Sequence, residues 1–162
     1  MSAEREGAAP SAATRKRLLA LASAGGHWSQ LMLMRPAFAD AEVFYASTMK
    51  GAGDLYALER YRAVPDCNRN ERVKIVACAA AILWLMIRVR PHVVVTTGAL
   101  PGLIALAIGK FFGAKTVWID SVANSFELSM AGASAHKYAA VWLSQWPEVA
   151  ETTGAGYQGS VL

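Results

Sequence analysis

A histidine that follows a pair of glycines is the residue of this sequence best placed to do chemistry. Residues 18–30, LLALASAGGHWSQ, contain a short apolar run, then Gly25 and Gly26, then His27 at the start of a helical pattern. This order predicts a buried strand, a glycine turn and a helix N-terminus, whose unpaired N–H groups favour an anion such as phosphate. Histidine titrates near neutral pH, so His27 is a candidate general base; helix capping and packing are the structural alternatives. The turn lacks a complete G-x-G-x-x-G and a G-K-[ST] ending, so by itself it is as consistent with a structural turn.

A carboxylate at the end of a later strand is the second candidate. Asp120 closes the β-rich stretch 115–120, and we expect it either to face a cleft or to cap the turn that follows. Ligands of parallel α/β sheets bind beyond the carboxyl ends of the strands. The loops expected to meet there are 23–27, 97–102 and 120–127.

Alternating strand and helix patterns must position these loops. We expect strands at 18–22, 41–47, 61–65, 92–98, 115–120 and 141–147, and helices from 28 to about 35, at 54–60, 73–89, 103–112 and 131–140. The strand at 61–65 is expected at a sheet edge because proline stops it, and 154–162 is a glycine-rich tail. Short strand–helix–strand links build parallel sheets with right-handed crossovers. The sequence therefore predicts an α/β fold, a Rossmann-like doubly wound parallel sheet.

Composition narrows the class of partner. Hydrophobic residues make up 54% of the 162 residues and charged residues only 17%, which indicates a face covered by a membrane or a partner. The net charge of +4 suits phosphorylated substrates or anionic lipid. A nucleic-acid role is not expected, because the basic residues lack interleaved surface aromatics.

The N-terminal segment and the cysteines indicate the cellular compartment in which the protein is expected. Residues 1–16 are predicted to be a disordered basic tail before a domain at 17–162, and the apolar run after the tail is too short for an export signal. Cys67 and Cys78 form no C-x-x-C and have no histidine cluster beside them, so we expect a reducing cytoplasm, no metal and no cofactor.

The stretch 73–89 predicts a strong helix that is apolar nearly all round. Its uncharged part, 75–87, is shorter than the roughly 20 residues that a membrane span needs. It is either a core crossover helix or one that also docks on a bilayer, with its basic flanks on lipid headgroups. The candidate membrane-surface residues are Arg72, Lys74, Trp84, Arg88 and Arg90.

Four stretches occur in matching order in one family: SAGGH at 23–27, TTGA at 96–99, GAKTVWIDS at 113–121 and QWPE at 145–148. On these the chain resembles the PssD-like exopolysaccharide glycosyltransferase subunits over residues 17–162. That family is related to the membrane-anchoring subunit of the eukaryotic two-part UDP-GlcNAc transferase, and both are similar to the N-terminal half of a MurG-type GT-B glycosyltransferase.

The resemblance implies the acceptor-binding subunit of a split, inverting UDP-sugar hexosyltransferase that acts on a polyprenyl-diphosphate-linked saccharide in polysaccharide biosynthesis. It implies a location at the cytoplasmic face of the inner membrane, and no activity without a PssE-like partner chain that holds the UDP-sugar. His27 and Asp120 become candidate catalytic residues. The candidate acceptor and diphosphate contacts are Gly25, Gly26, Thr97, Gly98, Gly102 and Ser121.

The sequence departs from the family at two places. Asp120 stands where relatives commonly carry glutamate, and residues 122–124 (Val-Ala-Asn) replace an aromatic and an arginine. Two alternatives stay open: a standalone nucleotide-binding Rossmann oxidoreductase, although the first loop lacks its third glycine, and a non-catalytic membrane scaffold that recruits the catalytic partner.

Overall fold

The computed structural model describes residues 15–161, so the predicted tail lies outside the described residues except for Arg15 and Lys16. Seven strands form one sheet in the order β3-β2-β1-β4-β5-β6-β7, and every neighbouring pair is parallel. The strands are β1 Arg17–Ala22, β2 Glu42–Ser47, β3 Tyr61–Ala63, β4 Val93–Thr96, β5 Lys115–Ile119, β6 Val141–Ser144 and β7 Gly156–Tyr157. This confirms the doubly wound parallel sheet and the edge position of β3.

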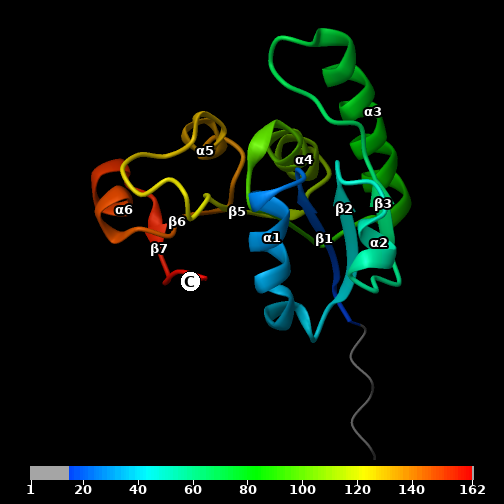
Figure 1. The fold of residues 1–162 in the computed structure, drawn as a ribbon, viewed down its shortest axis with the longest axis horizontal. Coiled ribbons are helices and arrows are strands. Elements are labelled where there is room, and N and C mark those ends of the chain that lie inside the picture. Colours follow the sequence, from blue (N-terminus) through cyan, green and yellow to red (C-terminus); the bar gives the residue numbers. More distant parts are fainter. Residues whose placement is uncertain (1–14, 162) are drawn as a thin grey trace, which may run out of the picture.

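Helices cover both faces of the sheet (Figure 1). They are α1 Gly26–Leu33, the 3-10 helix η1 Arg35–Phe38, α2 Ala52–Leu55, α3 Arg72–Val89, α4 Ala99–Phe111, α5 Met130–Ala135 and α6 Pro147–Thr153. Strand β1 shows why helices pack on both faces of the sheet. Its side chains alternate, so that Leu19 and Leu21 enter the core under α3 and α4, whereas Leu18 and Ala20 enter the core on the α1 side. Both faces are buried, as parallel sheets require.

The strand order changes direction between β1 and β4: β2 and β3 follow on one side of β1, and β4 to β7 follow on the other side. Strand β1 pairs with β2 on one side and with β4 on the other, and α3 makes the crossover from β3 to β4. A crevice opens at such a switch point beyond the carboxyl ends of the two strands. His27 follows β1 and Thr97 follows β4, so the topology brings both residues to this crevice.

Two helix boundaries differ from the sequence prediction. Helix α4 begins at Ala99 rather than at residue 103, because Pro101 falls within the first turn, whose N–H groups have no intrahelical partner. Helix α2 spans Ala52–Leu55 rather than 54–60, because Ala57 adopts a left-handed backbone conformation with φ of 48°.

The C-terminal part also differs. Helix α5 ends at Ala135 rather than at residue 140, because the residues after it bond to strand β5 instead of continuing the helix. Thr116 Oγ1 of β5 donates to the Tyr138 carbonyl at 2.6 Å. Strand β6 ends at Ser144 and is not the last strand. Pro147 opens α6, and the glycine-rich segment predicted as a tail supplies β7 at the sheet edge.

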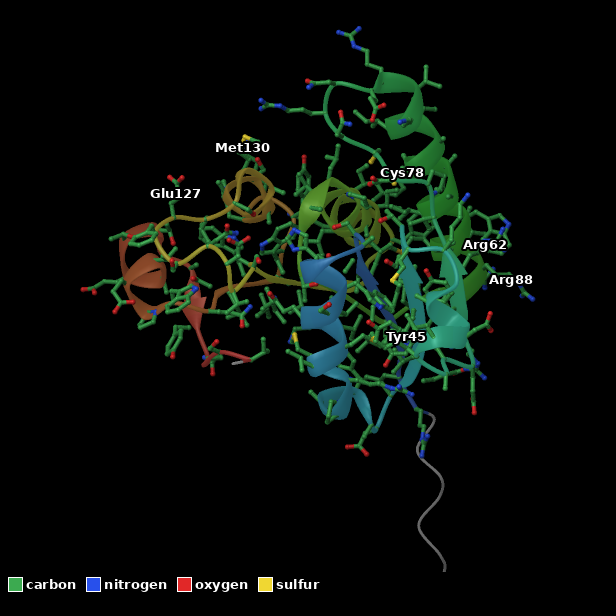
Figure 2. The ribbon with its side chains drawn as sticks, in the orientation of Figure 1. Tyr45, Arg62, Cys78, Arg88, Glu127 and Met130 are labelled. Atoms are coloured by element: carbon green, nitrogen blue, oxygen red, sulfur yellow. The ribbon has the colours of Figure 1, made fainter. Side chains whose placement is uncertain are left out.

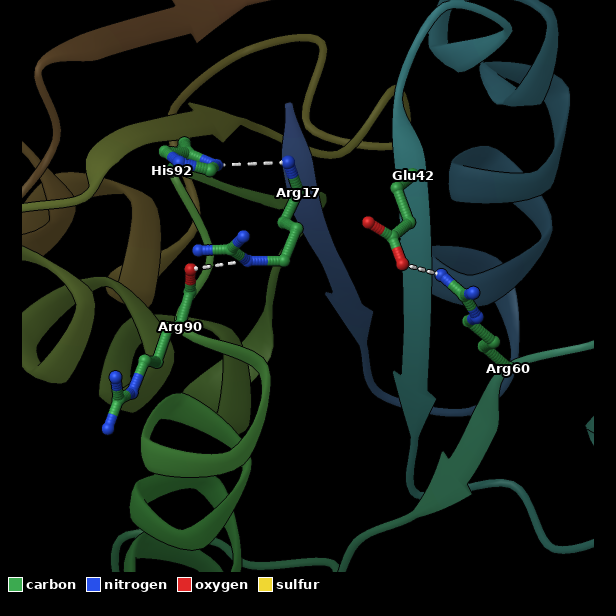
Figure 3. A network of polar contacts seen from close by, with 5 residues as sticks. All are labelled: Arg17, Glu42, Arg60, Arg90 and His92. Atoms are coloured by element: carbon green, nitrogen blue, oxygen red, sulfur yellow. Dashed lines mark hydrogen bonds and ion pairs between the residues drawn. The ribbon is translucent and has the colours of Figure 1, made fainter. Parts of the chain in front are cut away.

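A polar network closes the opposite, amino-terminal end of the sheet (Figure 3). The Arg17 backbone N–H donates to His92 Nδ1 at 3.0 Å, and Arg17 Nε donates to the Arg90 carbonyl at 3.0 Å. On the neighbouring strand, Arg60 pairs with Glu42. These bonds tie the start of β1 to the turn before β4 and lie far from the switch-point crevice.

Helix α3 is apolar on two opposite faces. One face packs into the core through Cys78, Ile82, Leu85, Met86 and Val89. The opposite face, here called the outer face of α3, exposes Val73, Val76, Leu83, Trp84 and Ile87. Within residues 15–161, no helix is long and apolar enough to cross a membrane.

Candidate functional site

A cleft of about 640 Å³ opens beside the switch point, at the carboxyl ends of the strands. Three walls enclose it: the loop before α3, the first turn of α4 and the first turn of α5. His27 reaches it from the start of α1. The lining residues are His27, Cys67, Asn68, Arg69, Asn70, Ala99, Leu100, Leu103, Ser129, Met130, Ala131 and Ser134.

The His27 imidazole is held by the loop that follows β4. Its Nδ1 lies 2.9 Å from the Thr97 carbonyl oxygen, and Thr97 Oγ1 donates to the His27 carbonyl at 2.6 Å. A carbonyl oxygen can only accept, so the proton of the neutral ring sits on Nδ1 in this bond. The lone pair is then on Nε2, where it can accept a proton from a ligand in the cleft.

The N-terminus of α4 forms the cleft wall next to His27. Among residues 15–161, no side chain caps this 13-residue helix, and its first turn carries no acidic residue. Gly98 has φ of 140° and Ala99 has φ of 65°, two successive left-handed residues at the mouth of the cleft. Such strain in a non-glycine residue is held in place by its surroundings and is typical of ligand-contacting segments. Because Ala99 and Leu100 of the first turn line the cleft, the positive end of the α4 dipole faces it.

Asp120 does not face the cleft, which corrects the expectation of a cleft-facing carboxylate. Its side chain is 1% exposed. Its carboxylate accepts hydrogen bonds from Trp118 Nε1 at 3.1 Å, Asn124 Nδ2 at 3.0 Å, and Ser129, whose backbone N–H and Oγ lie at 3.0 and 2.7 Å. These contacts match the capping alternative. Because Ser129 is the N-cap of α5, Asp120 holds one wall of the cleft in place, while its catalytic role stays a prediction.

Gln30 is a linking residue that the sequence analysis did not single out. Its Nε2 donates to the Asp120 carbonyl at 3.2 Å, and its Oε1 accepts from the Val122 N–H at 3.0 Å. Gln145 adds a second bond to the same Asp120 carbonyl at 2.8 Å. The three loops expected to converge are thus joined: His27 contacts the second, and Gln30, one turn later, contacts the third. The local signal in the sequence that could have indicated this link between loops is a glutamine one turn after the glycine pair.

The loop before α3 forms a cleft wall that the sequence analysis did not predict. Asn68 Oδ1 accepts from the Asn70 N–H at 3.0 Å, and Asn68 also bonds to Glu71, which shapes the turn. Arg69 reaches across to the other wall, with Nη1 3.5 Å from Met130 Sδ. In Figure 2, Met130 projects from α5 toward this loop. Arg69 therefore places a positive charge at the rim.

The remaining predicted contacts do not line the cleft. Gly25 is the N-cap of α1 with φ of 82°, and Gly26 is the first residue of that helix. Gly102 packs on Thr96, where a Cβ would lie 2.2 Å from Oγ1, and Ser121 Oγ accepts from the Ala123 N–H at 3.2 Å. These contacts are structural, and the ligand-binding roles of these residues stay predictions.

The two cysteines lie side by side but are poor nucleophiles. Both are buried, Cys67 in the cleft wall and Cys78 beneath it on α3. Burial raises the pKa of both thiols, that of Cys78 to about 12, so both stay protonated at neutral pH. Among the described residues, no three or more histidine, cysteine or acidic side chains gather as a metal site.

The predicted membrane-surface residues lie on or next to α3. Arg72, Lys74, Arg88 and Arg90 are exposed, and Lys74 pairs with Glu71 at 2.5 Å. Trp84 lies on the outer face with 46% of its surface exposed. The geometry agrees with a basic rim around an apolar face.

No protein-family model matches this sequence, and no curated protein matches it. Among solved structures, MurG of Acinetobacter baumannii is similar with a TM-score of 0.68 and 13% identity, over 83% of this chain and 43% of its own. UDP-GlcNAc 2-epimerase of Methanocaldococcus jannaschii, in complex with UDP-GlcNAc and UDP, reaches 0.66 at 11% identity, over 85% and 42%. A Rickettsia africae glycosyltransferase reaches 0.55 at 11% identity, over 76% and 34%.

This likeness concerns the fold. The chain spans less than half the length of each of these three proteins. The chain has the fold of a single Rossmann-like lobe of the GT-B type.

Proposed function

We propose that this chain is the acceptor-side lobe of a two-part UDP-sugar glycosyltransferase that elongates a polyprenyl-diphosphate-linked saccharide. The observation that carries the proposal is the His27 imidazole, which lines a cleft of a GT-B-type lobe with Nδ1 bonded to Thr97. The likeness of the fold to MurG supports a lobe of the GT-B type, and the acceptor-side assignment rests on the family resemblance.

In this proposal His27 is the general base. Its Nε2 accepts the proton of the acceptor hydroxyl as that oxygen bonds to the anomeric carbon of the sugar and UDP leaves with the electrons of the broken bond. The Thr97 carbonyl stabilises the imidazolium that forms, because it holds the Nδ1 proton. The acceptor diphosphate lies on the N-terminus of α4, within reach of Arg69.

Asp120 acts through Ser129 rather than on the substrate. It anchors the α5 wall, which faces the α4 N-terminus across the cleft. The cleft keeps its width only while this anchor holds. We therefore assign Asp120 a positioning role.

The UDP-sugar requires a second lobe. In the proposal that lobe is a separate, PssE-like chain, an assignment that rests on the family resemblance. Met130 lines the cleft and is 71% exposed, and Phe126, 95% exposed, lies on the loop before α5; in the proposal the second lobe covers these side chains.

The lobe works at the cytoplasmic face of the inner membrane. The apolar outer face of α3, with its basic flanks, supplies the docking surface. In the proposal, docking there brings a lipid-linked acceptor to the cleft.

The test is transferase activity of the chain co-expressed with its partner, measured on a polyprenyl-diphosphate-linked sugar. His27→Ala is expected to reduce turnover by about 10²- to 10⁴-fold while the two chains still co-purify. His136→Ala is the matched control, because His136, whose Nδ1 bonds to the Ala133 carbonyl and whose ring packs near Trp142, does not line the cleft. Unchanged activity of His27→Ala would favour the scaffold alternative, and full turnover by the chain alone would contradict the two-part enzyme.

A further inference from the structure

We propose that a groove between β3 and α3 binds the phosphate of an anionic lipid headgroup, an inference that rests on the membrane-docking part of the proposed function. The groove has a volume of about 260 Å³ and shares no lining residue with the cleft. Three arginines line it: Arg60, Arg62 and Arg88. Figure 2 shows Arg62 and Arg88 close together beside α3.

Aromatic rings hold two of these guanidinium groups in place. Arg62 Cζ lies 4.2 Å from the ring centroid of Trp84, and Arg60 Cζ lies 4.9 Å from that of Phe44. Stacking of this kind leaves the edge of the guanidinium free to donate hydrogen bonds. Because the side chain is ordered beforehand, less conformational entropy is lost when it binds a phosphate.

The charges of the groove are not all neutralised within the protein. Arg60 pairs with Glu42 (Figure 3). Within the part of the chain that the structure describes, Arg62 and Arg88 form no ion pair, and Glu59 is the single acid among the lining residues. A guanidinium without a carboxylate partner is well suited to bidentate contact with phosphate.

The surroundings favour a lipid phosphate over a soluble one. Trp84 lines the groove and also belongs to the outer face of α3, where Val76 and Ile87 are 69% and 54% exposed. The phosphate site and the apolar face therefore meet at one tryptophan, the side chain that is enriched at the boundary between headgroups and acyl chains. A soluble phosphate or an acidic peptide would leave the apolar face uncovered.

The experiment is co-sedimentation of the full chain with vesicles of two compositions: phosphatidylcholine alone, and phosphatidylcholine with phosphatidylglycerol in roughly a two-to-one ratio. The groove variant is Arg62→Gln with Arg88→Gln. The charge-matched control is Lys50→Gln with Lys137→Gln, two exposed lysines that do not line the groove. Circular dichroism checks that both variants fold.

The expected result is stronger binding to the anionic vesicles, about tenfold weaker in the groove variant and less than about threefold weaker in the control. Equal losses in both variants would overturn the proposal in favour of diffuse charge attraction. Binding of inorganic phosphate at micromolar concentration in the absence of vesicles, lost in the groove variant, would identify a soluble-phosphate site and also overturn the proposal.

A third variant separates this inference from membrane docking itself. Val76→Ser with Ile87→Ser makes the outer face polar without touching the groove arginines. If this variant loses binding while the groove variant keeps it, α3 docks on the bilayer and the headgroup site is wrong. Neither result depends on transferase activity, so the outcome is independent of the catalytic part of the proposed function.

Discussion

Gly98 packs directly against the imidazole of His27. A Cβ built on Gly98 would lie 2.5 Å from both Cε1 and Nδ1 of the ring. The residue also has φ of 140°, a conformation that L side chains rarely adopt. The glycine after β4 thus leaves room for the candidate base beside its hydrogen-bonding partner, the carbonyl of Thr97.

Gly98→Ala is therefore expected to displace the His27 ring and to strain the backbone. We expect a loss of about 1–3 kcal/mol in the free energy of unfolding and a fall in transferase activity. Urea denaturation and the two-chain assay measure the two effects. Gly26→Ala is the control: nothing lies within 4 Å of a methyl group added there and its φ is ordinary, so it should unfold no more easily than the natural chain. A Gly98→Ala protein as stable as that control would contradict the account.

Asp120→Asn is expected to destabilise the fold. The carboxylate accepts four hydrogen bonds from three residues, and an amide would turn a donor toward some of these donors. We expect a loss of about 2–4 kcal/mol, measured by urea denaturation. Glu127→Gln neutralises an exposed acid of the same loop and should change stability by less than about 0.5 kcal/mol. Similar stability of the two variants would show that Asp120 does not anchor α5.

Arg69→Ala is expected to weaken acceptor binding rather than the chemical step. The guanidinium lies at the cleft rim, where a charge-assisted bond to the acceptor diphosphate contributes about equally before and during transfer. We expect KM for the acceptor to rise about tenfold with kcat nearly unchanged. Steady-state kinetics of the two-chain enzyme measure this, with Lys50→Ala as the control outside the cleft. A fall in kcat at constant KM would instead assign Arg69 to the transition state.

The buried thiol of Cys78 is expected to make the folded protein less stable at alkaline pH. Burial raises its pKa from the ordinary 9.0 to about 12, so the folded state keeps a proton that the unfolded state releases. Stability is therefore unaffected below pH 9 and falls as the pH rises from 9 toward 12. Between about pH 7.5 and about pH 10.5 the natural chain should lose about 2 kcal/mol more than Cys78→Ala.

Chemical denaturation at the two pH values provides the measurement. Ile82→Val shortens a buried side chain of the same helix without removing a titrating group, so it should keep the pH dependence of the natural chain. Equal pH dependence in all three proteins would show that Cys78 is ionised as easily in the folded state as in the unfolded one.

Local sequence determined the order and type of the main elements. The continuous apolar run of β1, the valines of β4 and the β-rich run of β5 each predict a buried strand, because the strands of a parallel sheet are covered on both faces. Glycine turns and short links between them then permit little other than right-handed parallel crossovers. His27 was identifiable for the same reason, since a strand, a glycine pair and a helix start are adjacent in the chain.

Only the tertiary structure decided what Asp120, Gln30 and Arg69 contact. Their partners are the α5 N-cap, the loop after β5 and Met130, at sequence separations of 9, 92 and 61 residues. A strand-end carboxylate has the same local sequence whether it faces a cleft or caps a helix. Its donors arrive only when the sheet order and the helix packing are formed, and contacts between residues so far apart leave no periodicity for the sequence to reveal.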